Sequence, residues 1–155
     1  MTFNKTSEPL DAVNLRLLEE LGNDPRIPMS TLARRVGMSA PAVTERVRRL
    51  EDAGVITGYR TELAPEALGL PLTAYVRIRP TPGQLSRIAE LARQTSQVVE
   101  CHRITGEDCF LLKVHVATTE ELETVLDQFL THGQTTTSIV QSSPVPPRPL
   151  PLPDH

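Results

Sequence analysis

The spacing of apolar residues changes near residue 54 of this 155-residue chain, and the change limits the folds that are possible. Up to Gly54 the apolar residues recur at helical intervals, whereas beyond Leu72 several segments alternate as strands do. Aromatic residues make up only 3% of the chain and Trp is absent, so aliphatic side chains must form the core. We therefore expect an α+β protein with a helical N-terminal domain and a C-terminal domain built on a sheet.

Three short helices are predicted in the N-terminal part. The first covers about residues 9–21, the second begins with Ser30 as its N-cap, and the third covers residues 40–53. Gly37 permits a left-handed turn between the last two helices, and Ser39 can cap the third. Two short helices joined by a tight glycine-containing turn after a leading helix are typical of a helix-turn-helix, here of winged-helix-like type.

The C-terminal part predicts the element order β-α-β-β-α-β. Strands are expected at residues 72–79, 98–104, 109–116 and 135–141, with helices at 84–94 and 118–130. This order is that of a ferredoxin-like domain, in which both helices cover one face of a four-stranded sheet. The other face would be open and partly apolar, which predicts a partner, most simply a second copy of the chain.

These patterns divide the chain into four parts. The expected parts are a helix-turn-helix domain at 1–54, a linker at 55–71, a ferredoxin-like domain at 72–143 and a proline-rich tail at 144–155. A strand is expected in the linker at 55–63, and the tail is expected to form extended polyproline II. No run approaches the roughly 20 apolar residues of a membrane span, and no signal peptide is visible. Two cysteines are too few for a disulfide framework, so we expect a cytoplasmic protein.

The net charge of -3 argues against nucleic acid only if it is taken over the whole chain. Residues 1–60 carry nine basic and eight acidic side chains, and residues 61–155 carry seven and eleven, so +1 and -4 sum to -3. From Arg26 to Arg60 seven basic side chains stand against three acidic ones, a local +4. Few aromatic residues disfavour single-strand binding by base stacking, which leaves duplex DNA as the expected partner.

The third predicted helix has one face suited to DNA. Val43, Val47 and Leu50 should pack inward, and the N-terminal residues of such a helix meet base edges in the major groove. Small residues at its start allow close approach, polar ones can contact bases, and arginines can contact phosphates. The candidate DNA-binding residues are Arg26, Arg34, Arg35, Ser39, Ala40, Pro41, Thr44, Glu45, Arg46, Arg48 and Arg49. An arginine-rich soluble surface or a protein-docking module remains an alternative for this helix.

The sequence resembles the Lrp/AsnC (leucine-responsive, or feast/famine) family of transcription regulators. The resemblance rests on Leu10-Asp11, LARRVGMS at 32–39, VTERVRRLE at 43–51, GVITGY at 54–59, Leu68-Gly69, Thr105-Gly106 and TSIV at 137–140. It implies an N-terminal DNA-binding domain, a strand-containing linker, and a C-terminal domain that dimerises and often binds an amino acid. Family members form dimers and multiples of dimers, commonly octamers, and they activate or repress transcription.

The resemblance also implies an effector site at the turn between the second and third strands of the C-terminal domain. In the family this turn reads approximately Gly-Asp-x-Asp-Tyr, and its acidic residue helps to hold the amino group of an effector between dimers. Here Cys109 stands at the usual Asp, and a neutral thiol cannot give a charge-assisted hydrogen bond to an ammonium group. We expect the fold and assembly to be kept, with ligand preference altered or lost. The candidate ligand-binding residues are Gly106, Glu107, Asp108, Cys109, Thr135 and Thr137.

The turn can alternatively serve assembly alone, without any ligand. Asn14 stands where the family usually has a second Asp, and we expect only a local surface contact to differ.

A metal site and an active site are not expected. Cys101, His102, Cys109 and His115 lie on adjoining strands, but paired ligand spacings are missing, and neighbours in a strand point to opposite faces. The sequence has no nucleophile elbow and no phosphate-cradling glycine loop. We predict no cofactor, no metal and no enzymatic activity.

The leading hypothesis is a DNA-binding transcription regulator that acts as a dimer or a multiple of dimers, with an amino acid as a possible effector. One alternative is an architectural protein that wraps DNA with weak sequence preference and no effector. A further alternative is a small-molecule-binding domain whose helix-turn-helix contacts another protein.

Overall fold

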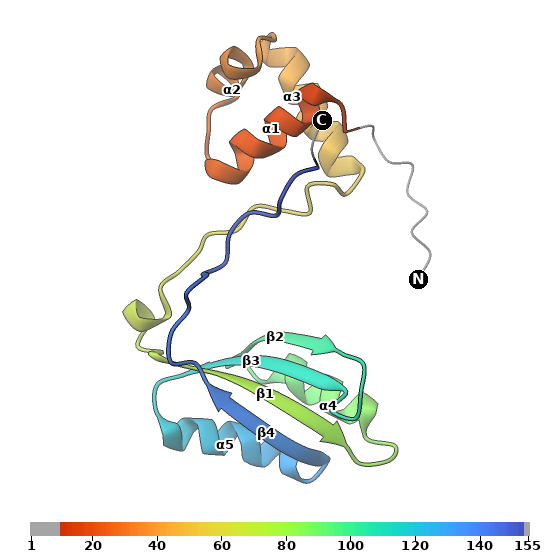
Figure 1. Cartoon of the computed structure of the whole chain (residues 1–155), viewed down its shortest axis with the longest axis vertical. Coiled ribbons are helices and arrows are strands. Elements are labelled where there is room, and N and C mark those ends of the chain that lie inside the picture. The colour runs from red at the N-terminus through yellow and green to blue at the C-terminus, as the bar shows by residue number, and fades with distance from the viewer. Residues whose placement is uncertain (1–9, 154–155) are drawn as a thin grey trace. The chain divides into compact units, whose positions relative to one another are not determined.

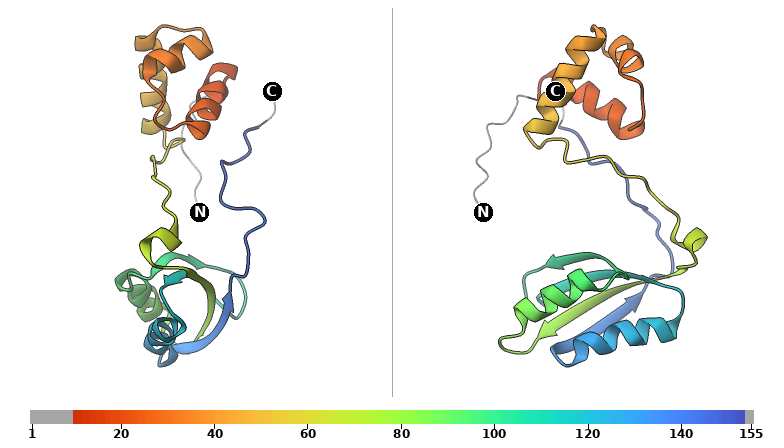
Figure 2. Two further views of the ribbon diagram at one scale, coloured as in Figure 1. Left: turned by 90° about the vertical axis from the view of Figure 1, so that its left-hand side faces the viewer. Right: turned by 180° about the vertical axis from the view of Figure 1, so that it is seen from behind.

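The computed structural model describes residues 10–153, and these form two compact units (Figures 1 and 2). One unit contains the chain up to Thr61 together with the segment from Val145, and the other contains Glu62–Pro144. The predicted start of the first helix at residue 9, the N-terminal segment searched for a signal peptide, and the last two residues of the tail lie outside the described residues. Within residues 10–153, no helix combines the length and apolar character needed to cross a membrane.

The N-terminal unit contains three helices: α1 (Ala12–Asn23), α2 (Met29–Val36) and α3 (Ala40–Asp52). Gly37 follows α2 with φ 71°, and the Ser39 hydroxyl accepts a hydrogen bond from the amide of Ala42 at 3.4 Å, so the predicted turn and N-cap are confirmed. The apolar core of these three helices is aliphatic, as expected, whereas the core of the other unit departs from the expectation and includes the buried Phe110 and Phe129. The core of the three helices includes Leu17, Leu21, Ile27, Leu32, Ala33, Val36, Val43 and Val47.

The predicted N-cap of α2 is wrong. Ser30 lies inside the first turn, and the helix begins after Pro28, whose carbonyl accepts hydrogen bonds from the amides of Thr31 and Leu32 at 2.9 Å. Proline already has a fixed φ, here -62°, so the chain enters the helix without a side-chain cap. The prediction of Ser30 as a capping side chain therefore placed the start of α2 too late.

The strand predicted at residues 55–63 is also wrong. This segment has no regular secondary structure, and the linker instead contains the short 3₁₀ helix η1 (Pro65–Leu68). A strand exists only when its backbone groups pair with another strand, and all strand pairing among the described residues lies within the C-terminal sheet. The hydroxyl of Tyr59 in this segment donates a hydrogen bond of 2.8 Å to Glu51 of α3.

The C-terminal unit has the predicted element order. Its elements are β1 (Leu72–Pro80), α4 (Leu85–Gln94), β2 (Val98–Arg103), β3 (Phe110–Val116), α5 (Thr119–Leu130) and β4 (Gly133–Ile139). The sheet has the order β2-β3-β1-β4, every pair is antiparallel, and both helices cover one face (Figures 1 and 2). The α+β class and the ferredoxin-like arrangement are therefore confirmed.

The register of the sheet decides which side chains share a face. Ala74, Val76 and Ile78 of β1 are buried against the helices, while Tyr75, Arg77 and Arg79 alternate with them on the open face. On β4, Thr135 pairs with Ile78 and Thr137 pairs with Val76. Because paired residues project to the same side, these two threonines lie on the helix side of the sheet.

The described part of the tail, residues 144–153, is exposed throughout and has neither helix nor strand. Its polyproline II conformation stays a prediction.

Any side chain in place of Gly133, at the start of β4, should destabilise the fold. A Cβ there would lie 2.5 Å from the backbone oxygen of Arg79 and 3.1 Å from a methyl group of Ile78. We expect Gly133→Ala to lower the free energy of unfolding by about 1–3 kcal/mol, measured by urea denaturation. Gly22→Ala is the matched control, because its nearest neighbour is the Pro149 ring at 3.6 Å, an ordinary contact. Equal stability of the two variants would contradict this packing argument.

Candidate functional site

One face of α3 is buried and the opposite face is exposed. Val43 and Leu50 are fully buried and Val47 is nearly so, which confirms the predicted inward stripe. Pro41 and Thr44 are exposed on the other face, close to the capped N-terminus. The Thr44 hydroxyl donates to the carbonyl of Ala40 at 2.9 Å, so a ligand would meet this oxygen as an acceptor. The helix therefore offers small and polar groups where its first turns face solvent.

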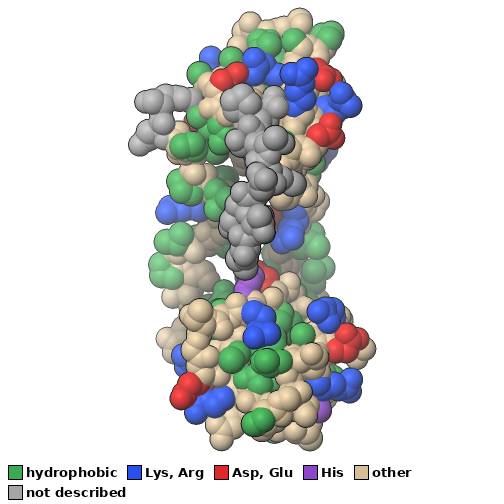
Figure 3. Space-filling view, turned by 90° about the vertical axis from the view of Figure 1, so that its right-hand side faces the viewer, with side chains coloured by type: hydrophobic (Ala, Val, Ile, Leu, Met, Phe, Trp, Pro, Cys, Tyr) green, Lys and Arg blue, Asp and Glu red, His purple; other side chains and the backbone are tan. Residues whose placement is uncertain are grey.

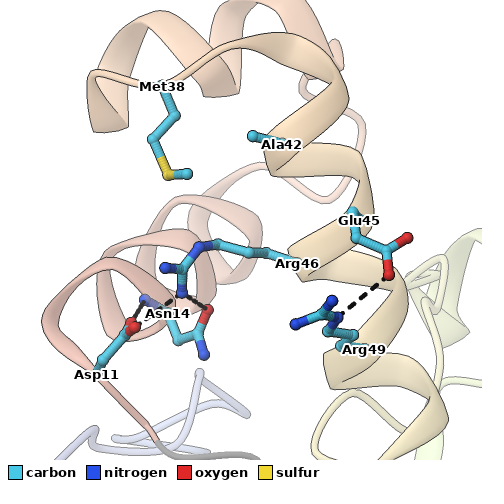
Figure 4. Close-up of a pocket in the computed structure, with 7 residues that line it drawn as sticks. All are labelled: Asp11, Asn14, Met38, Ala42, Glu45, Arg46 and Arg49. Carbon is cyan, nitrogen blue, oxygen red and sulfur yellow. Dashed lines mark hydrogen bonds and ion pairs between the residues drawn. The ribbon is translucent and has the colours of Figure 1, made fainter.

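Four charged side chains of α3 form a connected cluster, which we call the α3 charge cluster: Glu45, Arg48, Arg49 and Asp52. Glu45 accepts hydrogen bonds from Arg48 (3.2 Å from both Nε and Nη2) and from Arg49 Nε (3.1 Å; Figure 4). Asp52 Oδ2 lies 3.9 Å from Nη1 of Arg48. The bonds from Arg48, and then from Arg49, lower the pKa of Glu45, while Glu45 raises the pKa of Arg48.

Arg46 points away from this cluster and joins α3 to α1. Its Nη1 donates to Asp11 Oδ2 at 2.8 Å and to Asn14 Oδ1 at 3.1 Å (Figure 4). The second oxygen of Asp11 accepts from the backbone amide of Asn14 at 2.7 Å and so caps α1. We call this set of contacts the Asp11–Arg46 anchor. Arg46 was predicted as a phosphate contact, and the structure gives it acidic and amide partners on α1.

The expectation that Asn14 makes only a local surface contact is wrong. Asn14 is 2% exposed, and its side chain bonds to a residue 32 positions further along the chain. Its place three and seven residues before the buried Leu17 and Leu21 puts Asn14 on the inward face of α1, but the spacing does not indicate its partner on α3. In this chain Arg46 therefore contacts one carboxylate and one amide.

A surface hollow of about 330 Å³ lies between the anchor and the α3 charge cluster. It is lined by Asp11, Asn14, Met38, Ala42, Glu45, Arg46 and Arg49 (Figure 4).

The other predicted phosphate contacts lie outside α3. Arg26 is exposed in the loop before α2, and Arg34 at the end of α2 donates to the Thr31 hydroxyl at 3.3 Å. Arg35 forms an ion pair with Glu20 of α1. On the face seen in Figure 3, basic side chains of this unit lie beside acidic ones. The local charge of +4 counted along the sequence therefore includes arginines that already have partners.

The turn between β2 and β3 places its acidic residues beside two arginines of β1. Arg79 lies 2.6 Å from Glu107 and 3.4 Å from Asp108, and Arg77 lies 3.9 Å from Asp108. These arginines were not predicted. The alternation of β1 placed them on the open face, but only the pairing of β1 with β3 brings them to the turn.

Cys109 is turned inward. Its single S–H can donate to the carbonyl of Gly106 (3.3 Å) or to that of Glu107 (3.5 Å), and the residue packs against the sheet core. Thr135 and Thr137 lie on the helix side of the sheet, so within one chain they do not face the same side as the pairs that Arg79 makes. The structure thus brings together Glu107 and Asp108, with β1 arginines as additional members.

Cys101 pairs with Leu112 and His102 pairs with Leu111, so these neighbours face opposite sides of the sheet, as expected. Among residues 10–153, no three His, Cys, Asp or Glu side chains lie close enough to hold a metal ion.

Two family models match the chain. Residues 10–57 match a winged helix-turn-helix DNA-binding model, and residues 73–150 match the Lrp/AsnC ligand binding domain. LrpC of Bacillus subtilis, an HTH-type transcriptional regulator, is 33% identical over 86% of this chain and 92% of its own length. The solved LrpC structure superposes with a TM-score of 0.83 at 32% identity, covering 87% of this chain and 96% of the other.

Two further solved structures contain an amino acid. A feast or famine regulatory protein from Mycobacterium tuberculosis, complexed with L-methionine, is 35% identical and has a TM-score of 0.85, covering 92% of this chain and 99% of the other. A transcriptional regulator from Neisseria meningitidis, also complexed with L-methionine, is 29% identical with a TM-score of 0.83, covering 92% and 97%.

The Asp11–Arg46 anchor should make stability depend on acid pH. The hydrogen bond from the Asn14 amide, and then that from Arg46, lower the pKa of Asp11 from its ordinary 3.8 in the folded state. Its stabilising effect is therefore complete above the ordinary pKa and is lost as the pH falls through the lowered one. Asp11→Asn keeps a capping acceptor but not the charge, so it should be less stable at neutral pH by about 0.2–1 kcal/mol.

Urea denaturation at acid and neutral pH measures the free energy of unfolding of the unaltered protein and of Asp11→Asn. The difference between the two proteins should disappear as the pH falls. A double-mutant cycle with Arg46→Ala separates the ion pair from the cap, because Asp11→Asn should cost less once Arg46 is absent. Additive effects in the cycle would contradict the anchor.

Proposed function

Because this chain belongs to the Lrp/AsnC family and is a DNA-binding transcriptional regulator like its relatives, we propose that α3 is its recognition helix. The observation that carries this proposal is the exposed face of α3, with Pro41, Thr44 and Arg48 projecting opposite the buried stripe. A recognition helix enters the major groove with its N-terminal residues foremost. Ser39 and Ala40 are small enough at that end to let the backbone approach the duplex.

The partners of each arginine suggest how the contacts divide. Arg48 and Thr44 are placed to reach base edges, whereas Arg26, Arg34 and Arg49 are suited to phosphates. We assign Arg35 and Arg46 to holding α1, since both pair with acidic residues of that helix. This division modifies the roles expected from the sequence alone.

We also propose that an α-amino acid binds at the turn between β2 and β3. The support is that two relatives of the same fold are complexed with L-methionine. The proposed ligand-binding residues are Gly106, Glu107, Asp108 and Cys109, with Thr135 and Thr137 contributed across an interface between chains. In this chain the ligand's ammonium group would compete with Arg79 for the two carboxylates, and Arg77 or Arg79 would attract its carboxylate.

The proposed working form is a dimer, or a tetramer or octamer built from dimers. Two recognition helices in successive major grooves would be about 34–36 Å apart and would read an imperfect palindrome. The division at residues 54, 71 and 143 into DNA-binding domain, linker, effector domain and tail remains part of this proposal. So do the location in the cytoplasm, where the chain would reach DNA, and the lack of catalytic activity. The relatives' names favour regulation over DNA wrapping without an effector.

Removing Arg48 should affect sequence preference, and removing Arg49 should not. Arg48→Ala should relax the preference at one base pair by about 1–3 kcal/mol, because a bidentate contact to a guanine is lost. Arg49→Ala should weaken binding to all sequences alike, because a phosphate contact carries no sequence information. Selection of binding sites from random DNA, followed by titration of single-base variants, measures both effects. Equal losses on selected and random DNA for Arg48→Ala would overturn its assignment.

Amino-acid binding should be visible by calorimetry. Titration with each of the twenty amino acids should give heat and thermal stabilisation with at least one, and Asp108→Ala should reduce both because a carboxylate partner is lost. Glu123→Gln, which removes one charge from the exposed side of α5, is the control and should bind as the unaltered protein does. If none of the twenty amino acids gave heat or stabilisation, amino-acid sensing would be ruled out. The turn would then be left with a role in assembly.

A further inference from the structure

Glu45 is the hub of the α3 charge cluster. We propose that it is a positioning residue that sets the DNA specificity of this protein, because it holds Arg48 and Arg49 in ion pairs that weaken their attraction to phosphates but leave Arg48 able to read a base. This inference rests on the proposed role of α3 as the recognition helix.

The geometry leaves Arg48 partly available. Glu45 takes the Nε–H and one Nη2 hydrogen of Arg48, at 3.2 Å each. A guanidinium has five N–H donors, so three remain for a ligand. Asp52 lies one helical turn further on, 3.9 Å from Nη1, and confines the guanidinium from the other side. Arg48 is thus held in a defined direction on the exposed face of α3, with donors left over.

Arg49 is held through a single donor. Glu45 Oε1 accepts its Nε–H at 3.1 Å (Figure 4), while the same oxygen also accepts from Arg48 Nη2. One carboxylate therefore restrains two guanidiniums that project from neighbouring positions of the helix.

The charges of this cluster cancel, since two arginines stand against Glu45 and Asp52. Phosphates attract a protein through net charge, and this attraction supplies nearly all binding to random DNA. Base edges present neutral donors and acceptors, which a paired guanidinium can still contact. An ion pair with Glu45 therefore reduces binding to random DNA more than binding to a target site. That difference is a gain in specificity.

If Glu45 only stabilised the fold, its loss would lower the temperature of unfolding and leave the ratio between target and random DNA unchanged. Exposed ion pairs contribute little to stability, so the loss of Glu45 should leave thermal unfolding nearly unchanged. Its effect should appear in DNA binding, and specifically in the ratio between target and random sequences.

The test compares the full-length protein with Glu45→Gln, on a duplex selected by the protein and on a random duplex of equal length, at several salt concentrations. We expect affinity for random DNA to rise by about 3- to 10-fold and affinity for the target to rise less, so the ratio falls. For random DNA, the slope of log affinity against log salt should steepen by about 1–2 per protomer, as released arginines each neutralise a phosphate. Glu19→Gln on α1 removes the same charge from the same unit and should preserve the ratio and the slope.

Several results would overturn the proposal. An unchanged ratio and slope for Glu45→Gln would make its ion pairs irrelevant to recognition. Loss of target binding with unchanged affinity for random DNA would mean that Glu45 reads a base itself. If Glu19→Gln changed the ratio as much as Glu45→Gln does, the effect would come from the total charge of the protein and not from the ion pairs of Glu45. If neither Arg48→Ala nor Arg49→Ala alters DNA binding, the assignment of α3 as the recognition helix fails, and this inference fails with it.

Discussion

The orientation of α3, the proposed recognition helix, is supported by the contact between Asp11 and Arg46. Asp11 caps α1 with one oxygen and binds Arg46 of α3 with the other, so the start of one helix is tied to the middle of another. The cluster of buried apolar side chains beneath them is aliphatic. Such side chains drive association without directional bonds, whereas a charge-assisted hydrogen bond fixes an angle. The contact therefore adds a directional bond to the buried stripe of α3 and helps to fix how its exposed face is presented.

Charge pairing recurs in both units and changes what a count of arginines means. Around α3 the arginines have carboxylate partners one turn away, and at the turn of the sheet domain Arg79 contacts both Glu107 and Asp108. A ligand at either place meets a pair rather than a bare charge. Binding then depends on exchanging one partner for another, which favours ligands that match the geometry over those that supply charge alone.

The sequence predicted what is local and missed what depends on pairing. The helix-turn-helix and the β-α-β-β-α-β order followed from periodicity, and Ser39 from its position before a helix. The apolar pattern at 55–63 did not reveal whether a partner strand exists, and no strand of the described sheet pairs with this segment. The burial of Asn14 and the approach of Arg79 to the turn arise from contacts across 32 and 28 or more positions. The residues of the proposed DNA interface could be named from the sequence, but their partners within the fold could not.

The absence of Trp has a practical consequence for anyone who follows this protein in solution. Of the two tyrosines, Tyr59 is bonded to Glu51 of α3, and Tyr75 lies on the open face of the sheet. Burial, and then the hydrogen bond to Glu51, raise the pKa of Tyr59 to about 12. Each compact unit therefore carries one tyrosine, and the alkaline titration of Tyr59 absorbance provides a spectroscopic label for the helix-turn-helix unit without any added dye.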